Sequence, residues 1–414
     1  MRRIAIVLSA LLVVGGALSA WILSNGERHA VQRSTRVTIQ PKPRAATGSW
    51  PTYGRDSART HAAPFSLRPP YRRLWSVYGD SSFIEFPPVV AAGRLYFGTD
   101  RGRVVAVDTG DGKTAWERFL GLCIAASPAV SGSTVFVAAM GTRPCGRGRG
   151  GLVAFDASNG DLRWRFSAGP IESSPLVVGD LVVVGSRDGH VYALDTRDGR
   201  VRWSFATSAP VKGGAAAAHG RVYIGSYDGN VYALAVQTGR LRWRSSARGG
   251  GRFYATPTVA DGRVFIGATD GAVYAFGERT GVLRWTRPLG SFVYSSGAIA
   301  AGRLYVGSYG HRLYALDAAT GIVVWSYEGR GPVSGAPTVL DGLVFFSSCG
   351  SCSTYESNPS ARRTYAVDAR TGRLVWEFPD GEYSPVVTDG RRLYVTGYTT
   401  VYALAPIGNR RPGG

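Results

Sequence analysis

The stretch Asp317-Ala-Ala-Thr-Gly-Ile-Val-Val-Trp325 is one copy of a motif that recurs along most of this 414-residue chain. In every copy a Gly is followed four residues later by a Trp, whereas the distance between copies varies. A fixed local motif with variable spacing indicates one repeated structural unit whose loops absorb the insertions. The seven copies end at the pairs Gly112/Trp116, Gly160/Trp164, Gly199/Trp203, Gly239/Trp243, Gly281/Trp285, Gly321/Trp325 and Gly372/Trp376.

The residues around each motif are typical of short β-strands. In residues 296–327, runs rich in Val, Leu and Tyr at 302–308, 312–317 and 323–327 are separated by Gly and Asp. Asp-Gly pairs, such as the one that begins at Asp228, supply the positive φ that two-residue hairpin turns need. No part of the repeat region has a helical period, so the sequence predicts an all-β domain.

The number of repeats predicts a closed ring. A third-strand pattern with a central Ala occurs eight times, but the Trp-containing fourth strand follows only the first seven. An unmatched strand of the fourth type, residues 73–77 with Trp75, precedes the first set. If this N-terminal strand completes the last blade, both open sheet edges disappear. We therefore predict an eight-bladed β-propeller over residues 71–405, with structural tryptophans at Trp75, Trp116, Trp164, Trp203, Trp243, Trp285, Trp325 and Trp376.

Three further segments are predicted outside the propeller. Residues 1–23 combine a basic start with an uncharged apolar run from Ile4 to Leu23, which fits either a membrane-spanning signal anchor or a cleaved signal peptide. Either reading places the rest of the chain outside the cytoplasm, at the cell membrane or secreted. Residues 24–70 read as a basic, Pro- and Arg-rich tether, although Trp50-Pro-Thr-Tyr-Gly54 could instead dock on the domain. Residues 406–414 read as a disordered tail.

The formal net charge of +20 is carried almost entirely by Arg. Such a field attracts anionic lipids or polymers. Alternatively, the charge reflects compositional bias scattered over loops. No nucleic-acid-binding signature accompanies it, which argues against a nucleic-acid partner.

The repeat resembles that of a known family. Units of the form Ser-Pro-Val-Val, Arg-Val-Tyr-x-Gly-Ser-x-Asp-Gly, Val-Tyr-Ala-Leu-Asp and Thr-Gly-x-x-x-Trp resemble the pyrroloquinoline-quinone (PQQ) repeat of the quinoprotein alcohol dehydrogenase-like propellers. The resemblance covers residues 71–405 and implies eight blades. Members of that family diverge in activity: some are periplasmic dehydrogenases, whereas others, BamB-like propellers and propellers fused to receptor kinases, are binding scaffolds without the cofactor.

Candidate ligand-binding residues lie in the loops that enter the first strand of each blade. In propellers these loops and the loops between the second and third strands emerge on one face, around the central channel. Polar groups that converge there could hold a small ligand or channel water. The candidates are Glu85, Glu172, Lys212, Arg252, Tyr254, Tyr294, Glu382 and Tyr383.

The parts of a quinoprotein dehydrogenase are not evident. The resemblance implies Ca²⁺ beside the quinone, and a hard cation needs several convergent oxygen ligands. The chain has isolated carboxylates at Glu85, Glu172 and Glu382, no adjacent cysteines and no Cys-x-x-Cys-His for haem attachment. Its five histidines show no metal-binding spacing. We therefore expect no catalytic or metal-ligating residues and no cofactor, with PQQ and Ca²⁺ as the alternative.

The four cysteines favour disulfides, given an even count outside the cytoplasm. Cys123 and Cys145 lie in loops expected on the same face, and Cys349 and Cys352 could close on each other. For the second pair, a redox dithiol and half of a zinc site remain alternatives.

Together these features predict a monomeric, membrane-anchored, non-catalytic propeller that binds an envelope protein or an anionic polymer. The alternatives are a PQQ-dependent oxidoreductase of reduced size and a ligand-sensing propeller.

Overall fold

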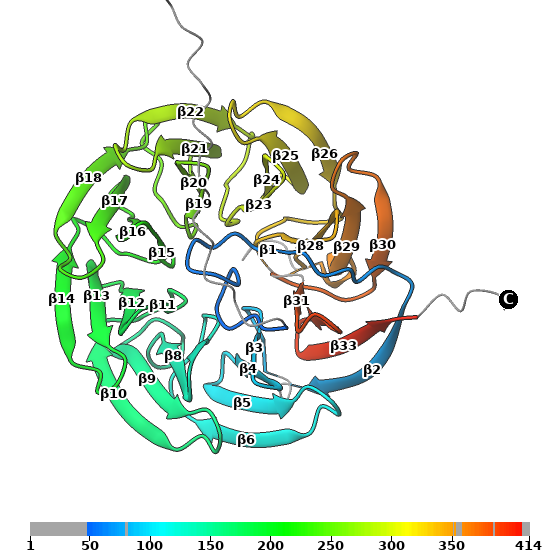
Figure 1. The fold of residues 1–414 in the computed structure, drawn as a ribbon, viewed down its shortest axis with the longest axis horizontal. Coiled ribbons are helices and arrows are strands. Elements are labelled where there is room, and N and C mark those ends of the chain that lie inside the picture. Colours follow the sequence, from blue (N-terminus) through cyan, green and yellow to red (C-terminus); the bar gives the residue numbers. More distant parts are fainter. Residues whose placement is uncertain (1–47, 79–81, 351, 353–357, 384–385, 408–414) are drawn as a thin grey trace, which may run out of the picture. The chain divides into compact units, whose positions relative to one another are not determined.

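The computed structural model describes residues 48–78, 82–350, 352, 358–383 and 386–407. These residues form eight antiparallel sheets arranged around a common axis (Figure 1). Each sheet has four strands, and one gains a short fifth strand, β1 (Ala62–Ala63), which pairs in parallel with β27. The eight-bladed propeller predicted from the sequence is confirmed.

Within blades 1 to 7 the strands run from the axis to the rim in chain order. Blades 1 to 4 are β3 (Val89–Ala91), β4 (Arg94–Gly98), β5 (Arg103–Asp108), β6 (Thr114–Phe119); β7 (Ala129–Ser131), β8 (Thr134–Ala139), β9 (Gly150–Asp156), β10 (Leu162–Ala168); β11 (Leu176–Val178), β12 (Leu181–Gly185), β13 (His190–Asp195), β14 (Val201–Ala206); and β15 (Ala216–Ala218), β16 (Arg221–Gly225), β17 (Asn230–Ala235), β18 (Leu241–Ser246). Blades 5 to 7 are β19 (Thr258–Ala260), β20 (Arg263–Gly267), β21 (Ala272–Gly277), β22 (Leu283–Pro288); β23 (Ala298–Ala300), β24 (Arg303–Ser308), β25 (Arg312–Asp317), β26 (Val323–Glu328); and β27 (Thr338–Leu340), β28 (Leu343–Ser348), β29 (Arg363–Asp368), β30 (Leu374–Phe378), with the 3₁₀ helix η1 (Pro359–Ala361) before β29.

Blade 8 closes the ring with strands from both ends of the propeller sequence. It consists of β31 (Val386–Thr388), β32 (Leu393–Thr396), β33 (Thr400–Pro406) and, at the rim, β2 (Tyr71–Tyr78). In this pairing Trp75 lies opposite Ala403, as Trp203 lies opposite Ala193 in blade 3. The unmatched strand of the sequence therefore occupies the position of the missing fourth strand.

The recurring Gly and Trp pack against each other across neighbouring blades. The indole N–H of Trp203 donates to the carbonyl oxygen of Val236 in the next blade over 2.7 Å. A Cβ placed on Gly239, also in the next blade, would lie 2.6 Å from the Trp203 ring. Seven indoles have such a glycine from the next blade against them, which explains the fixed motif. They are Trp75, Trp116, Trp164, Trp203, Trp243, Trp285 and Trp325.

Residues 48–70 pack on the propeller, with the stretch from Trp50 to Ala63 crossing its centre (Figure 1), and we call residues 50–63 the hub segment. Hub carbonyls accept hydrogen bonds from first-strand amides of six blades: the donors are Val90, Val130, Ala217, Val259, Ile299 and Val339. The buried Arg59 side chain reaches blades 3 and 4, where it donates to the carbonyls of Pro175 and Ala215. Among the described residues, the hub segment thus bonds to the inner strands of blades 1, 2 and 4 to 7 and to the residues directly before the inner strand of blade 3.

The hub segment corrects the prediction of a tether over residues 24–70. Trp50 is 1% exposed and Arg59 is fully buried, so the second half of that segment is part of the folded domain. The alternative, in which residues 50–54 dock on the domain, is the correct one. Hub carbonyls accept hydrogen bonds from amides of the innermost strands, which would otherwise lack a partner. The predicted anchor over residues 1–23, the start of the tether and most of the tail from 408 lie outside the described residues.

Among the residues that the structure describes, no helix has the length and hydrophobicity needed to cross a bilayer.

Candidate functional site

A cavity of about 310 Å³ lies at the channel, with Tyr53 of the hub segment in its wall. Its other walls come from two sets of loops: those that lead into the first strands, and those between second and third strands. The eight candidates from the sequence divide into two groups here. Six of them line the cavity, namely Glu85, Glu172, Lys212, Tyr254, Tyr294 and Tyr383.

The other two candidates lie outside the lining. Arg252 is exposed, and its guanidinium lies 5.8 Å from the centre of the Tyr227 ring, beside the cavity. Glu382 is fully buried and its carboxylate contacts Cys349 and Arg362. The channel position predicted for Glu382 is therefore wrong. The expanded loop of blade 7 carries the two residues that hold this carboxylate, and the next residue, Tyr383, lines the cavity instead.

A charged network occupies one side of the cavity. Arg187 forms a two-point ion pair with Glu172, with Nε–Oε1 and Nη2–Oε2 distances of 2.9 and 2.7 Å. Lys212 Nζ lies 3.9 Å from Glu172 Oε1 and 4.5 Å from the centre of the Tyr227 ring. The hydrogen bond to Glu172 raises the pKa of Arg187, and burial lowers the pKa of Lys212. Glu172 is thus already neutralised by protein cations.

Tyrosines form the adjoining wall. Tyr254 and Tyr294 have ring centres 4.9 Å apart, and Tyr309 lies 4.9 Å from Tyr294 at a steep angle. Tyr227 continues this row at 6.3 Å from Tyr254. Burial, followed by the nearby carboxylates of Glu172 and Glu85, raises the pKa of Tyr254 well above its usual value. These phenols stay neutral near pH 7, so the wall offers aromatic faces and hydroxyl groups.

Glu85 also lines the cavity, but its carboxylate is not part of the network of Glu172, Arg187 and Lys212. Within the described part of the chain, no donor forms a hydrogen bond or ion pair with it. Burial, with contributions from the carboxylates of Glu172 and Asp100, raises the pKa of Glu85 to about 7. Near neutral pH this group can therefore accept or release a proton, or bind a cation.

The cavity does not fit calcium beside a quinone. Ca²⁺ takes about six to eight oxygen ligands. Glu172 is bound to Arg187 and Lys212, which leaves Glu85 as the available carboxylate. Across the described ranges, groups of three or more potential metal ligands occur at Cys349, Cys352 and Glu382 and not in the cavity.

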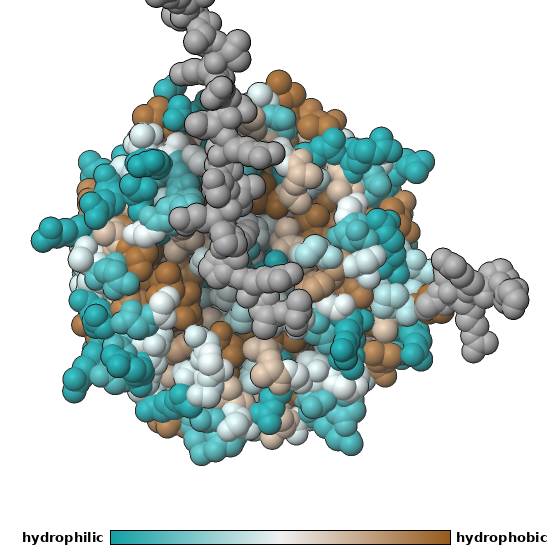
Figure 2. Space-filling view, in the orientation of Figure 1, coloured by the Kyte–Doolittle hydropathy of each residue, from teal (hydrophilic) through white to brown (hydrophobic). Residues whose placement is uncertain are grey.

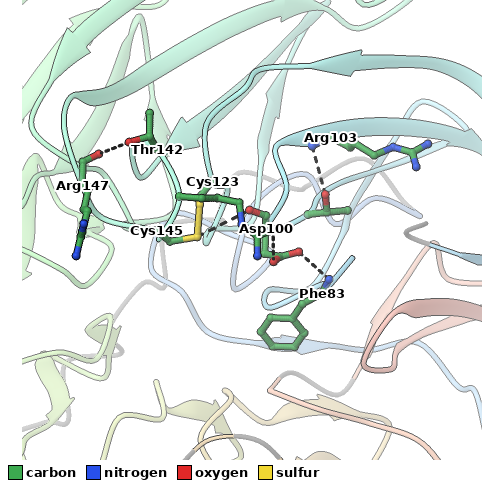
Figure 3. Close-up of a disulfide and its surroundings, with 9 residues drawn as sticks. Phe83, Asp100, Arg103, Cys123, Thr142, Cys145 and Arg147 are labelled. Carbon is green, nitrogen blue, oxygen red and sulfur yellow. Dashed lines mark hydrogen bonds and ion pairs between the residues drawn. A yellow bond between two sulfur atoms is a disulfide. The ribbon is translucent and has the colours of Figure 1, made fainter. Parts of the chain in front are cut away.

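Both predicted disulfides are present. Cys123 and Cys145 are bonded with Cα atoms 5.5 Å apart, in the entry loop and the expanded loop of blade 2 (Figure 3). Cys349 and Cys352 are bonded with Cα atoms 5.6 Å apart. The first bond fastens two loops near the cavity. In blade 2 the position that Glu172 occupies in blade 3 is taken by Ala125, and Cys123 lies two residues before it.

Among the cavity residues that sequence reasoning missed are three large side chains in the loops between second and third strands: Arg187, Tyr227 and Tyr309. Each follows the serine that comes directly after or ends the second strand of its blade. Aligning the repeats at that serine would have found them, because the residue after it lines the cavity in blades 3, 4 and 6.

A family model described as outer membrane protein assembly factor BamB matches residues 123–212, 204–292 and 287–409. A 154-residue stretch is 32% identical to the serine/threonine-protein kinase AfsK of Streptomyces griseus, covering 33% of this chain and 18% of the kinase. Another, of 141 residues, is 30% identical to BamB of Bordetella pertussis and covers 34% of each chain. The matches thus span about a third or less of these relatives.

Two solved structures show the same fold. The crystal structure of BamB from Moraxella catarrhalis has a TM-score of 0.66 at 20% identity, covering 81% of this chain and 100% of that one. Quinohemoprotein alcohol dehydrogenase from Comamonas testosteroni has a TM-score of 0.70 at 16% identity, covering 89% and 82%. Because the family model accounts for well over half of the residues, this chain belongs to the PQQ-repeat propeller family of the outer membrane protein assembly factor BamB.

Proposed function

We propose that this protein is a membrane-anchored, extracytoplasmic scaffold whose propeller binds an envelope protein and whose channel carries out no quinone-dependent catalysis. The observation that carries the proposal is an apolar rim on blades 6 and 7, at a position where blades 2 to 5 carry arginine. The rim consists of Ile322, Val323, Val324, Leu374 and Val375, which are between 40% and 58% exposed.

The repeat shows how this rim differs from its counterparts. In blades 2 to 5 the residue directly before the Trp of the repeat motif is an arginine: Arg163, Arg202, Arg242 and Arg284. Arg163 and Arg202 bind the aspartate that ends the third strand, at 2.7 and 3.1 Å. In blades 6 and 7 the residue is Val324 or Val375, and the aspartate accepts a hydrogen bond from a threonine of its own turn instead.

The geometry of the rim suits a protein partner. Strands β26 and β30 end their sheets, and no strand among the described residues pairs with their outer edges. An extended segment can add to such an edge through main-chain hydrogen bonds, while its side chains contact the aliphatic groups. Figure 2 shows hydrophobic side chains at the rim near β26. An apolar rim favours a protein over an anionic polymer, which would be drawn to the arginine-bearing blades.

Other features support the location and the class of function. Two disulfides are typical of proteins outside the cytoplasm. The relatives named BamB are outer membrane assembly factors, which fits a propeller that binds envelope proteins. The apolar run from Ile4 to Leu23 supports the anchor.

Site-specific crosslinking tests the proposal. A photoreactive benzophenone residue is introduced at position 324 and, as the matched control, at position 202 in the full chain expressed in its own envelope. We expect an adduct with an identifiable envelope protein at 324, no such adduct at 202, and loss of the adduct when Val375→Arg is added. Equal adducts at both positions, or none, would reject the scaffold role of this rim.

The cavity favours a second candidate function, the sensing of a small ligand. Glu85 and the tyrosine wall form a built site in which no described residue forms a hydrogen bond or ion pair with the carboxylate. Incubation with PQQ and Ca²⁺, with dye reduction by alcohols and sugars as the readout, distinguishes this candidate from the oxidoreductase. Turnover would establish the enzyme, whereas binding of any small molecule without turnover would support sensing.

A further inference from the structure

The disulfide Cys349–Cys352 differs from its counterpart in blade 2 in what surrounds its sulfur atoms. Cys349 is 2% exposed and Cys352 is partly exposed. The Glu382 Oε1 atom lies 2.9 Å from Cys349 Sγ, and Glu382 itself is fully buried. Arg362 holds the other carboxylate oxygen, with an Nε–Oε2 distance of 3.3 Å, and lies over the ring of Tyr398 at 3.7 Å.

The disulfide Cys123–Cys145 provides an internal comparison. It also has one buried sulfur, on Cys123, and one exposed cysteine, Cys145. The oxygen near its accessible sulfur is the main-chain carbonyl of Asp100, at 3.8 Å (Figure 3). Among the described residues, a carboxylate in contact with a disulfide sulfur is thus a property of the Cys349–Cys352 pair.

This contact favours the reduced form of the pair. A disulfide sulfur carries no hydrogen, so the contact between Cys349 Sγ and Glu382 is not a hydrogen bond while the pair is oxidised. After reduction the Cys349 thiol can donate to the carboxylate, and hydrogen bonds to charged acceptors are about twice as strong as neutral ones. The cysteines are also only 3 residues apart, compared with 22 in the other pair, so the bond constrains the unfolded chain less.

We propose that Cys349 and Cys352 form a thiol–disulfide exchange site that oxidises an external dithiol, with Glu382 as the residue that positions the Cys349 proton. A thiolate of the dithiol attacks the partly exposed Cys352 Sγ, the bond to Cys349 breaks, and Cys349 leaves with the electron pair and takes up a proton beside Glu382. The second thiol of the dithiol then attacks the dithiol sulfur of the mixed disulfide and releases Cys352 as a thiol. Two electrons and two protons pass from the dithiol to the protein.

Redox titration of the full chain tests this proposal. The protein is equilibrated with mixtures of reduced and oxidised dithiothreitol, free thiols are alkylated, and each cysteine peptide is quantified by mass. We expect Cys349–Cys352 to be reduced under conditions at least tenfold less reducing than Cys123–Cys145, which is about 30 mV for two electrons. Glu382→Gln should lower the equilibrium constant for reduction of Cys349–Cys352 by about tenfold, because it replaces a charged acceptor with a neutral one. The same substitution should leave Cys123–Cys145 unchanged.

Two further arms separate this from a structural role. Glu377→Gln, on the exposed face of β30, is the matched control and should move neither pair. In Cys352→Ser the lone Cys349 thiol should titrate above about 8.5, the ordinary value for a thiol, because Glu382 stabilises its protonated form. The proposal is overturned if both disulfides titrate together, if Glu382→Gln shifts neither, or if Cys349 titrates at or below the ordinary value. Stoichiometric retention of zinc by the reduced chain, without exchange, would assign the same three side chains to a metal site instead.

Discussion

Arg59 Nε donates a hydrogen bond to the carbonyl oxygen of Ala215 over 2.8 Å, from the hub segment to the innermost edge of blade 4. The same guanidinium donates to Thr52 and Tyr53 within the hub segment and to Ser174 and Pro175 at blade 3. The guanidinium donates its hydrogen bonds to main-chain carbonyls and one hydroxyl, and the Asp56 carboxylate interacts with it electrostatically. The Arg59 side chain therefore adds hydrogen bonds between the hub segment and blades 3 and 4, beyond those that the hub backbone makes.

We expect Arg59→Met to destabilise the protein by at least about 2 kcal/mol, because it leaves several buried carbonyl groups without donors. Urea unfolding followed by tryptophan fluorescence measures the change. Arg101→Met is the control, since Arg101 is exposed and should change stability by less than about 0.5 kcal/mol. Equal effects of the two substitutions would show that the hub segment is dispensable.

Two glycine substitutions separate backbone strain from interblade packing. Gly239 and Gly220 both have positive φ, of 65° and 72°, but an added Cβ meets the Trp203 ring only at Gly239. Gly220→Ala should cost about 1–2 kcal/mol for the left-handed conformation. Gly239→Ala should cost about 1–3 kcal/mol more, because the new methyl group displaces the indole. Thermal unfolding of the two variants gives the difference, and equal losses would contradict the packing role of this glycine.

The raised pKa of Glu85 predicts a specific pH dependence. An unfolded chain releases this proton near 4.5, whereas the folded protein holds it up to about pH 7. Between these values the folded state binds more protons, so the contribution of Glu85 to stability falls as pH rises and the penalty is complete above pH 7. Glu85→Gln should therefore raise the melting temperature at pH 8 and change it little at pH 4.5. Parallel melting profiles for the two proteins would refute the shift.

Removing the two disulfides should have unequal effects. Replacement of Cys123 and Cys145 by Ala opens a 22-residue separation and should cost about 3 kcal/mol. Replacement of Cys349 and Cys352 by Ala opens a separation of 3 residues and should cost about 2 kcal/mol. Each pair has one buried and one more accessible cysteine, so the comparison mainly reports the loop length. Denaturant unfolding under non-reducing conditions supplies both values, and a reversed order would contradict the loop argument.

Much of the fold could be predicted because its signals are local. The Gly and Trp of each motif lie four residues apart, and each pair is fixed by contact with a neighbouring blade. The position of Trp75 opposite Ala403 follows from the same register as in the other blades. The hub segment could not be predicted in this way, because it is held mainly by backbone carbonyls, which every residue possesses.

The site was predicted in part for a related reason. Register along the repeat singled out Glu85, Glu172 and Lys212, which all line the cavity, since these loops share one backbone path. It failed for Glu382 because a side chain from another blade, Arg362, binds that carboxylate. Such a contact joins loops of two different blades, and no motif or spacing in the sequence indicates that these two loops meet.

The pairing of β2 with β33 also sets the timing of assembly. Seven blades are built from consecutive hairpins and can form as each segment is made. Blade 8 must wait, because its rim strand is synthesised first and the strand beside it last. During synthesis β2 remains a strand without a neighbour, and the ring completes only when the final hairpin emerges. We therefore expect closure of this blade to be the slow step of folding, and the interval before it to be the period when the chain is most exposed to aggregation.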